Sequence, residues 1–235
     1  MSKTILIAPF DGPLAAALAA EAEGAGWSAA LALARGGPSG VAEAGAGSGA
    51  AEDGPARREE ASGRRADAIA IAYEPRSFVS ASALVLSAEN ALGPLDAAAL
   101  VFDPAGARAE FLGAKPGELA ALVEERCSGP LFLARELVRR FEARGSGRLI
   151  LVAPESPRDA ALGPAAAMAE KAFEGLGAGL FAAAASAVWS VYGIRDASGQ
   201  ADRLARFALE LLAEPKPSKA GRWLRYSGKG GIFGQ

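Results

Sequence analysis

The chain has 235 residues, of which 51% are hydrophobic and 7% aromatic, and its formal net charge at pH 7 is −2. This length suits a single domain over residues 1–235. The small net charge argues against a nucleic acid or an anionic membrane as partner. The absence of histidine excludes Ser-His and Cys-His catalytic pairs and histidine metal sites. The lone cysteine, Cys127, can form neither an internal disulfide nor a thiolate cluster, so we expect an inert thiol and no metal.

We expect neither a signal peptide nor a membrane-spanning segment. The opening MSKTILIAPF enters an apolar run without the charged start and cleavage site of a signal peptide. Residues 175–194 are uncharged and long enough to span a bilayer. Their alanine- and glycine-rich first part and β-like second part instead predict a buried helix that runs into a central strand. We therefore expect a cytoplasmic protein with no membrane partner.

Short apolar strands alternate with helices in the first half of the chain. A strand at 4–9 precedes a helix for which Asp11 is a cap and Pro13 a first-turn residue, and a second strand follows at 27–34. Residues 36–66 are dominated by glycine, serine and charge, which predicts a flexible loop. After this loop we expect a strand at 67–75, a helix at 78–92 and a strand at 95–104.

The same alternation continues to the C-terminus. Residues 115–144 predict two helical parts separated at 128–130, and the second part places Leu133, Leu137 and Phe141 on one face. Beyond them we expect a strand at 148–154, a helix at 164–185, a strand at 186–193, a helix at 202–213 and a strand at 221–228. This order predicts an α/β fold, namely a Rossmann-like doubly wound parallel sheet with helices on both faces.

Four segments match, in order, the motifs of one enzyme family. LVFDPAG, GRLILVAP, AEKAFEGL and AGRWLRYSGKGG stand where that family has LVNNAG, GRIVNISS, SKAALEGL and GQVLHVDGG. Over essentially its whole length the chain thus resembles the short-chain dehydrogenases/reductases (SDRs). That family works with an Asn-Ser-Tyr-Lys tetrad. Its tyrosine exchanges the proton, its lysine lowers the tyrosine pKa and holds the nicotinamide ribose, its serine binds the substrate oxygen, and its asparagine orders a water.

The resemblance implies that this tetrad has degenerated. Its four positions fall, in family order, on Arg126, Pro154, Ala167 and Lys171. Alanine and proline carry no titratable proton, so neither can act as a general acid or hold an alkoxide. Ser156 is the nearest hydroxyl, two residues out of register. Lys171 is interpreted as a remnant whose stem packs on the sheet or, alternatively, as part of an anion or ligand site with Arg126 and Asp103.

The resemblance also implies that the cofactor loop is lost. The family's glycine-rich turn brings backbone N–H groups to a pyrophosphate, and its glycines are replaced here by Pro9, Pro13 and Ala15. Proline has no N–H and a fixed φ, and Asp11 adds a negative charge where the pyrophosphate would lie. The adenosine-lining Asn-Asn-Ala-Gly reads Asp103-Pro104-Ala105-Gly106, and the Pro-Gly near the nicotinamide reads Tyr192-Gly193. We expect this chain to bind no cofactor and NAD to be bound by a partner subunit.

The helix pair that makes the dimer contact in the family is the best-preserved part of the chain. Helices 130–144 and 164–185 retain that pattern, and small residues in the second permit close approach. We therefore predict a pseudoenzyme subunit that joins an active SDR in a heterotetramer, as an NAD-dependent alcohol or hydroxyacyl-CoA dehydrogenase. The resembling precedent serves anaerobic, toluene-type aromatic degradation. Two alternatives stay open: a stand-alone homodimeric ligand-binding or regulatory protein, and a divergent enzyme that uses Lys171 as base or Schiff-base amine.

Overall fold

The computed structural model describes residues 2–35, 68–103, 112–155, 163–215 and 218–228. The strands in these segments are β1 (Thr4–Ala8), β2 (Ser28–Ala34), β3 (Ala68–Tyr73), β4 (Ala97–Val101), β5 (Arg148–Pro154), β6 (Ser190–Asp196) and β7 (Trp223–Tyr226). The helices are α1 (Gly12–Gly24), α2 (Phe78–Leu92), α3 (Pro116–Val123), α4 (Gly129–Arg144), α5 (Pro164–Ala184) and α6 (Ala201–Ala213), and a π-helical turn, η2 (Glu124–Ser128), joins α3 to α4. The loop predicted at 36–66 lies outside the described residues.

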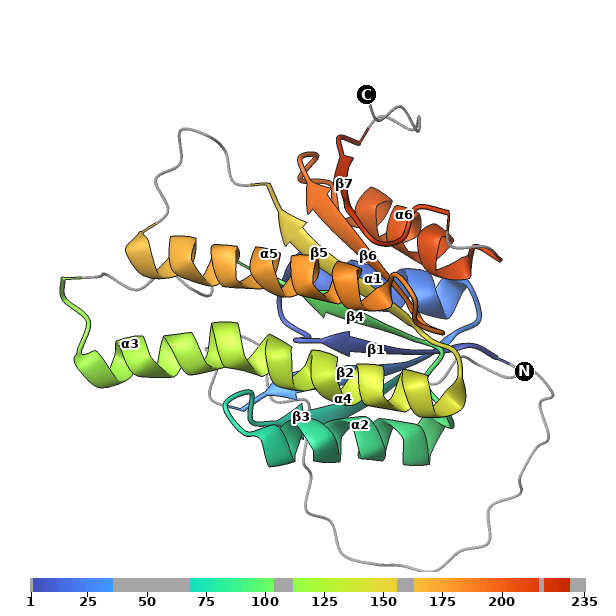
Figure 1. The fold of residues 1–235 in the computed structure, drawn as a ribbon, viewed down its shortest axis with the longest axis horizontal. Coiled ribbons are helices and arrows are strands. Elements are labelled where there is room, and N and C mark those ends of the chain that lie inside the picture. Colours follow the sequence, from blue (N-terminus) through green and yellow to red (C-terminus); the bar gives the residue numbers. More distant parts are fainter. Residues whose placement is uncertain (1, 36–67, 104–111, 156–162, 216–217, 229–235) are drawn as a thin grey trace, which may run out of the picture.

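The seven strands of the described segments form one parallel sheet in the order β3-β2-β1-β4-β5-β6-β7. Helices α2, α4 and α5 cover one face, and α1 and α6 cover the other (Figure 1). The predicted Rossmann-like α/β fold is therefore confirmed. The strand order reverses between β1 and β4, and in such sheets the crevice at the carboxyl ends of these two strands is the usual ligand site.

Side chains of alternate strand residues supply the two halves of the core. On β1, Leu6 faces the α2, α4 and α5 layer, whereas Ile5 and Ile7 face α1 and α6. Both faces are covered, so β1, β4 and β5 are apolar along nearly their whole length, as is typical of parallel sheets. This pattern is what made the strands recognisable in the sequence.

Two predicted boundaries are wrong. The chain does not break at 128–130, because the helix passes through η2 into α4 and the N–H of Gly129 donates to the carbonyl of Glu124. Glycine permits close packing there, since a Cβ at Gly129 would lie 3.1 Å from the Pro75 carbonyl oxygen and would displace it by a few tenths of an ångström. The strand predicted at 186–193 begins only at Ser190, which pairs with Arg148, and it continues to Asp196.

Candidate functional site

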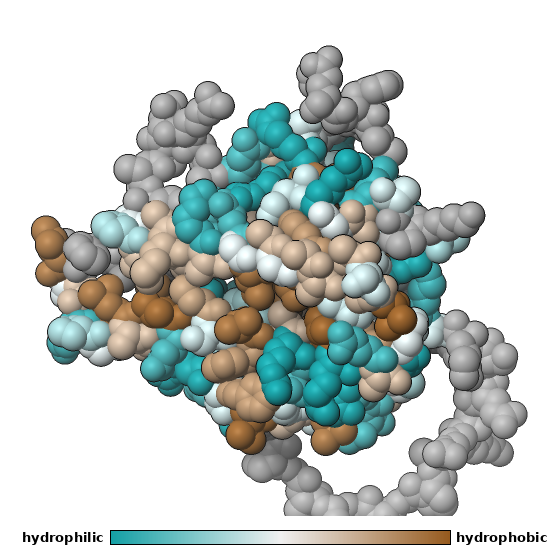
Figure 2. All heavy atoms as spheres, in the orientation of Figure 1, coloured by the Kyte–Doolittle hydropathy of each residue, from teal (hydrophilic) through white to brown (hydrophobic). Residues whose placement is uncertain are grey.

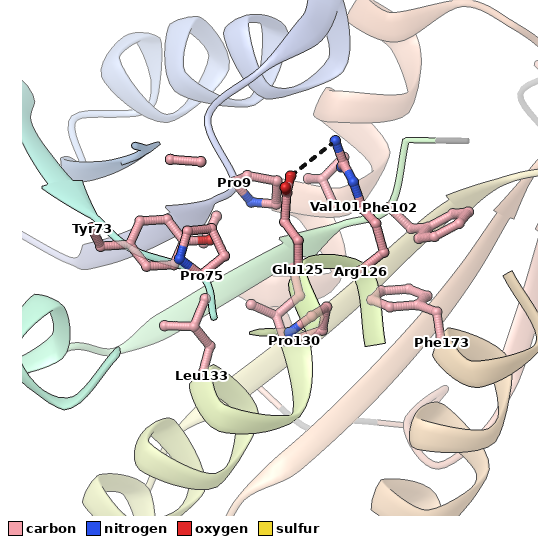
Figure 3. A pocket seen from close by; sticks show the side chains of 13 residues that line it. Pro9, Tyr73, Pro75, Val101, Phe102, Glu125, Arg126, Pro130, Leu133 and Phe173 are labelled. Carbon is pink, nitrogen blue, oxygen red and sulfur yellow. Dashed lines mark ion pairs between the residues drawn. The ribbon is translucent and has the colours of Figure 1, made fainter. Parts of the chain in front are cut away.

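A small cavity lies at the carboxyl ends of β1, β3 and β4, beside η2 and the first turns of α4 (Figure 3). It encloses about 30 Å³ and is partly open to solvent. Most of its wall is apolar, with the rings of Pro9, Pro75 and Pro130 among the lining groups. Its position beside the point where the strand order reverses makes it the candidate ligand site of the fold.

Arg126 supplies the positive charge of this cavity. It is the buried residue of the η2 turn, and its side chain is only 10% exposed. Its guanidinium lies between two carboxylates: Nη1 is 4.0 Å from Oδ2 of Asp11, and Nη2 is 3.3 Å from Oε1 of Glu125. Arg126 is therefore neutralised by the chain itself.

Asp11 stands at the N-terminus of α1, where the family would bind a pyrophosphate. Its side chain makes no capping hydrogen bond and instead faces Arg126. Burial raises the pKa of Asp11, the charges of Asp103 and Glu125 raise it further, and Arg126 opposes them. Oδ2 of Asp103 lies 4.0 Å from where a Cβ at Gly12 would be. Three carboxylates thus gather around the helix N-terminus, and they would repel a phosphate there.

Tyr73, the last residue of β3, closes another side of the cavity. The residue is 3% exposed, and Figure 3 shows it across the cavity from Glu125 and Arg126. Burial raises the pKa of Tyr73 far above its usual value, and the charges of Asp11 and Glu125 raise it further. Its hydroxyl therefore stays protonated and can donate a hydrogen bond at neutral pH. The sequence analysis missed both Tyr73 and Glu125. Tyr73 could have been identified as a candidate site residue, because it is a tyrosine at the carboxyl end of a predicted strand.

The predicted grouping of Lys171 with Arg126 and Asp103 is not what the structure shows. Lys171 does not line the cavity; its side chain is 73% exposed, and its Nζ pairs with Oε2 of Glu174 at 2.8 Å. The interpretation that its stem packs on the sheet is wrong for the same reason. Helix α5 turns Ala169 and Phe173 into the core, and Lys171, midway between them, lies on the opposite side of the helix.

The positions that the resemblance assigns to the family's serine and tyrosine are Pro154 and Ala167. Pro154 ends β5 in register with Asp196 of β6, and Ala167 lies half-buried near the start of α5. Ser156, the displaced hydroxyl, lies outside the described residues. No group of three or more metal-binding side chains occurs in the described segments. The geometry therefore offers no proton donor at either position.

Aromatic side chains pack together between α5 and the sheet. Phe173 of α5 stacks on Phe102 with ring centroids 5.4 Å apart, and Trp223 of β7 lies 6.4 Å beyond Phe173. Glycine makes this possible: a Cβ at Gly193 would lie 2.4 Å from the Trp223 ring, and one at Gly177 would lie 2.6 Å from it. The layer between α5 and β6 is thus closed by packed rings.

The Tyr192-Gly193 pair, to which the resemblance assigns the family's Pro-Gly position, lies within strand β6. Tyr192 is fully buried on the face covered by α1 and α6, away from the cavity. The register explains the difference, because Pro154 at the end of β5 pairs with Asp196 and Gly193 pairs three residues earlier, with Leu151. The pair therefore does not lie at the carboxyl end of β6, where the assigned position would require it to be.

Two further expectations concern Cys127 and the uncharged stretch 175–194. Cys127 is half-buried, and burial raises the pKa of its thiol. The uncharged stretch consists of the end of α5, a turn and the start of β6, which is the predicted order. The helix was predicted to be buried, and this is wrong, because Gly177 is the only buried residue of 175–184. No helix in the described part of the chain combines the length and the apolarity that a bilayer span requires.

Comparison with known proteins identifies the fold. No family model matches the sequence, and no curated protein sequence matches it significantly. Among solved structures, a short-chain dehydrogenase/reductase from Serratia marcescens has a TM-score of 0.70 at 15% identity, covering 95% of this chain and 96% of its own. A protein described as a short-chain dehydrogenase/reductase from Sinorhizobium meliloti gives 0.68 at 18%, covering 97% of both chains. A short-chain dehydrogenase from Rhodopseudomonas palustris gives 0.70 at 14%, covering 95% of this chain and 97% of its own. At these identities the likeness establishes the SDR fold and leaves the activity open.

Proposed function

We propose that the chain is a non-catalytic subunit of SDR fold that assembles with a catalytically active partner of the same fold. The catalytic positions support this proposal. Pro154 and Ala167 have no proton to exchange, and Lys171 pairs with Glu174 at the surface. An exposed, paired lysine also lacks the desolvation that a lysine base or Schiff-base amine needs. The structure therefore gives no support to a lysine-dependent enzyme.

The proposed subunit leaves NAD to its partner. The cavity at the carboxyl ends of the strands encloses about 30 Å³, which is room for one or two water molecules and far too little for a dinucleotide. At the N-terminus of α1, Pro13 lacks a backbone N–H, and the carboxylate of Asp11 occupies the neighbourhood in which a phosphate would bind. Binding a dinucleotide would require both features to rearrange.

The observation that carries the assembly proposal is an open apolar groove between α4 and α5. The groove measures about 380 Å³ and is lined by Leu131, Val138, Leu176 and Leu180, with Trp189 at its side. Figure 2 shows this band of hydrophobic side chains between the two helices, with a hydrophilic patch beside it over α4. Apolar surface of this kind, rimmed by polar groups, is typical of a protein interface.

Charged residues on α4 make the rim of this groove rigid. Glu136 is buried and accepts hydrogen bonds from Arg135 at 2.8 Å and from Arg139 at 2.8 and 3.2 Å. The two guanidiniums, both more than half exposed, are thereby held at fixed positions beside the apolar surface. Arginines held in this way lose little conformational entropy on binding, which favours their use in an interface.

The partner in this proposal carries the intact tetrad and the glycine-rich loop. Its reaction would be the NAD-dependent oxidation of an alcohol, with a hydroxyacyl-CoA of aromatic degradation as the substrate class that the sequence precedent suggests.

Native mass spectrometry of the tagged protein, purified from its own source cells, tests the proposal. The expected result is a complex with a second chain of similar size that has both motifs. Leu131→Glu is expected to abolish the complex, because it places a charge in the groove. Leu86→Glu on α2 is the matched control, since Leu86 is 46% exposed and Leu131 is 51% exposed. Recovery of the chain only as copies of itself would overturn the proposal.

A second candidate, a homodimer that binds a ligand, is favoured by one observation on α4. Arg135 and Glu142 are seven residues apart and both line the groove, so they share a helix face. In an antiparallel pairing of α4 with a second copy, each Arg135 would meet the other copy's Glu142. Reversing the charge of Arg135 alone would break such a homodimer, and the double reversal Arg135→Glu with Glu142→Arg would restore it.

A further inference from the structure

Two polar side-chain atoms are buried without a hydrogen-bond partner on the face of the sheet that α1 and α6 cover. One is the hydroxyl of Tyr192, a fully buried residue of β6, and the other is Oε2 of Glu214, the residue that follows α6. Buried polar groups in proteins are nearly always hydrogen-bonded, either within the chain or to an ordered water molecule. An unpaired group would bear the full cost of its removal from water. Both atoms therefore need a partner that the described side chains do not supply.

The register of the sheet and the end of α6 bring these two groups to one place. Arg148 of β5 pairs with Ser190 of β6, so it lies on the same face of the sheet as Tyr192 and diagonally next to it. Nη1 of Arg148 donates to the carbonyl of Leu212, two residues before Glu214. Burial raises the pKa of Tyr192, the charge of Arg148 opposes this, and the charge of Glu214 adds to it. The Glu214 carboxylate is thus close enough to act on the Tyr192 hydroxyl.

Both side chains are held in place by other contacts. The ring of Tyr192 is packed in the core between the sheet and the helices α1 and α6. The other oxygen of Glu214, Oε1, lies 3.7 Å from Nζ of Lys219, and the N–H of Glu214 donates to the last turn of α6. The Ser190 hydroxyl is near enough to lower the pKa of Tyr192, but its geometry leaves the Tyr192 hydroxyl without a hydrogen bond. A molecule that reaches both unpaired atoms would satisfy them without moving either side chain.

Water is the molecule whose chemistry fits this pair of atoms. The Tyr192 hydroxyl has a hydrogen to donate, whereas a carboxylate oxygen of Glu214 can only accept. The bridging molecule must therefore accept from one group and donate to the other. An anion cannot donate to Glu214, and a cation would be repelled by Arg148 and Lys219. Water does both, and two to four polar partners are what a buried water requires.

We propose that one ordered water molecule binds between Tyr192 and Glu214 and joins β6 to the C-terminal end of α6. The water accepts a hydrogen bond from the Tyr192 hydroxyl and donates one to Oε2 of Glu214. This bridge adds to the bond from Arg148 to the Leu212 carbonyl, so that two polar links hold the end of α6 on the sheet. The site lies on the opposite face of the sheet from α4 and α5. It therefore goes beyond the assembly proposed above and stands or falls independently of it.

Tyr192→Phe tests the bridge through the sign of its effect on stability. Loss of one hydrogen bond is expected to raise the unfolding equilibrium constant of the full-length protein about two- to tenfold, measured by urea denaturation. Were the hydroxyl unpaired, its removal would instead relieve the cost of burying it and lower that constant. A Tyr192→Phe variant at least as stable as the wild type would overturn the proposal.

A double-mutant cycle with Glu214→Leu tests whether the two residues share one partner. Because a single water serves both, the double variant is expected to raise the unfolding constant by less than the product of the two single effects. Glu210→Leu is the matched control, since Glu210 is an exposed glutamate about one turn earlier on α6. Its effect should multiply with that of Tyr192→Phe. Independent effects of Tyr192→Phe and Glu214→Leu would contradict the proposal.

Crystallography of the full-length protein distinguishes a bridging water from a direct contact. The expected result is electron density for one water about 2.8 Å from both the Tyr192 hydroxyl and Oε2 of Glu214. The same density should be lost or displaced in Tyr192→Phe. A direct hydrogen bond from Tyr192 to Glu214, or no water between them in the wild-type protein, would exclude the site.

Discussion

Phe173 is expected to be one of the most sensitive positions for stability, because its ring closes the layer between α5 and the sheet. It is 2% exposed and contacts Phe102 at 5.4 Å and Trp223 at 6.4 Å between ring centroids. Truncating a buried phenylalanine to alanine typically costs 3–5 kcal/mol, and the cost is highest where neighbours cannot collapse into the cavity. Trp223 is wedged over Gly177 and Gly193, where a Cβ would already clash. We therefore expect Phe173→Ala to lower the free energy of unfolding by about 4 kcal/mol.

Urea denaturation followed by far-UV circular dichroism measures this loss. For a chain of this length, about 4 kcal/mol corresponds to a fall in Tm of roughly 8–16 °C. Phe78→Ala is the control: Phe78 is 38% exposed, so we expect a loss below about 2 kcal/mol. A double-mutant cycle with Phe102→Leu should give a coupling of about 1 kcal/mol for the stacked pair. A loss in Phe173→Ala no larger than that in Phe78→Ala would refute the packing argument.

Two further predictions concern other buried contacts. Gly193→Ala is expected to lower stability by about 1–3 kcal/mol, because the new Cβ would lie 2.4 Å from the Trp223 ring. Gly179→Ala, on the open side of α5, should instead raise the free energy of unfolding by up to about 1 kcal/mol. A higher Tm for Gly193→Ala than for Gly179→Ala would contradict both expectations. Burial alone would raise the pKa of Glu136, but hydrogen bonds from Arg139 and the nearby arginine charges hold it below 4.5. The stabilisation that ionised Glu136 provides is therefore complete above pH 4.5 and is lost as the pH falls through the folded-state pKa. In Glu136→Gln the free energy of unfolding should depend less on pH in the acid range. An unchanged pH dependence would exclude this role for Glu136.

The elements that local chemistry specifies were predictable from the sequence. Helix α2 has the bounds Phe78–Leu92 that the pattern predicted. Its start is fixed by Ser77, whose side chain accepts a hydrogen bond from the N–H of Ser80, and its end by Gly93 at φ +87°. The strands β1, β4 and β5 were equally clear, because burial on both faces requires an unbroken apolar run. These signals lie within a few residues of the element that they define.

The cavity could not be predicted in this way. Tyr73 and Glu125 are 52 positions apart, and nothing near either residue indicates the other. They meet because the parallel sheet places the end of β3 beside the helix that crosses its face.

The orientation of Lys171, in contrast, could have been predicted from the sequence. Ala169 and Phe173 mark the buried side of α5, and a residue midway between them points away from it. We missed this orientation because the alignment with the family motif suggested a lysine that points into the site.

The direction of the Arg126 side chain depends on the π-helical turn that carries it. The π-helical turn η2 holds one residue more than an α-helical turn, which rotates everything before it by about 100° relative to α4. The side chain is thereby aimed at Asp11 at the start of α1, and not at Ala167 or Lys171 on α5. Deleting one residue of this turn would restore the α-helical phase and is expected to expose Arg126 and separate it from Asp11. A structure of that variant with the Arg126–Asp11 contact intact would show that side-chain packing, and not helical phase, determines where Arg126 points.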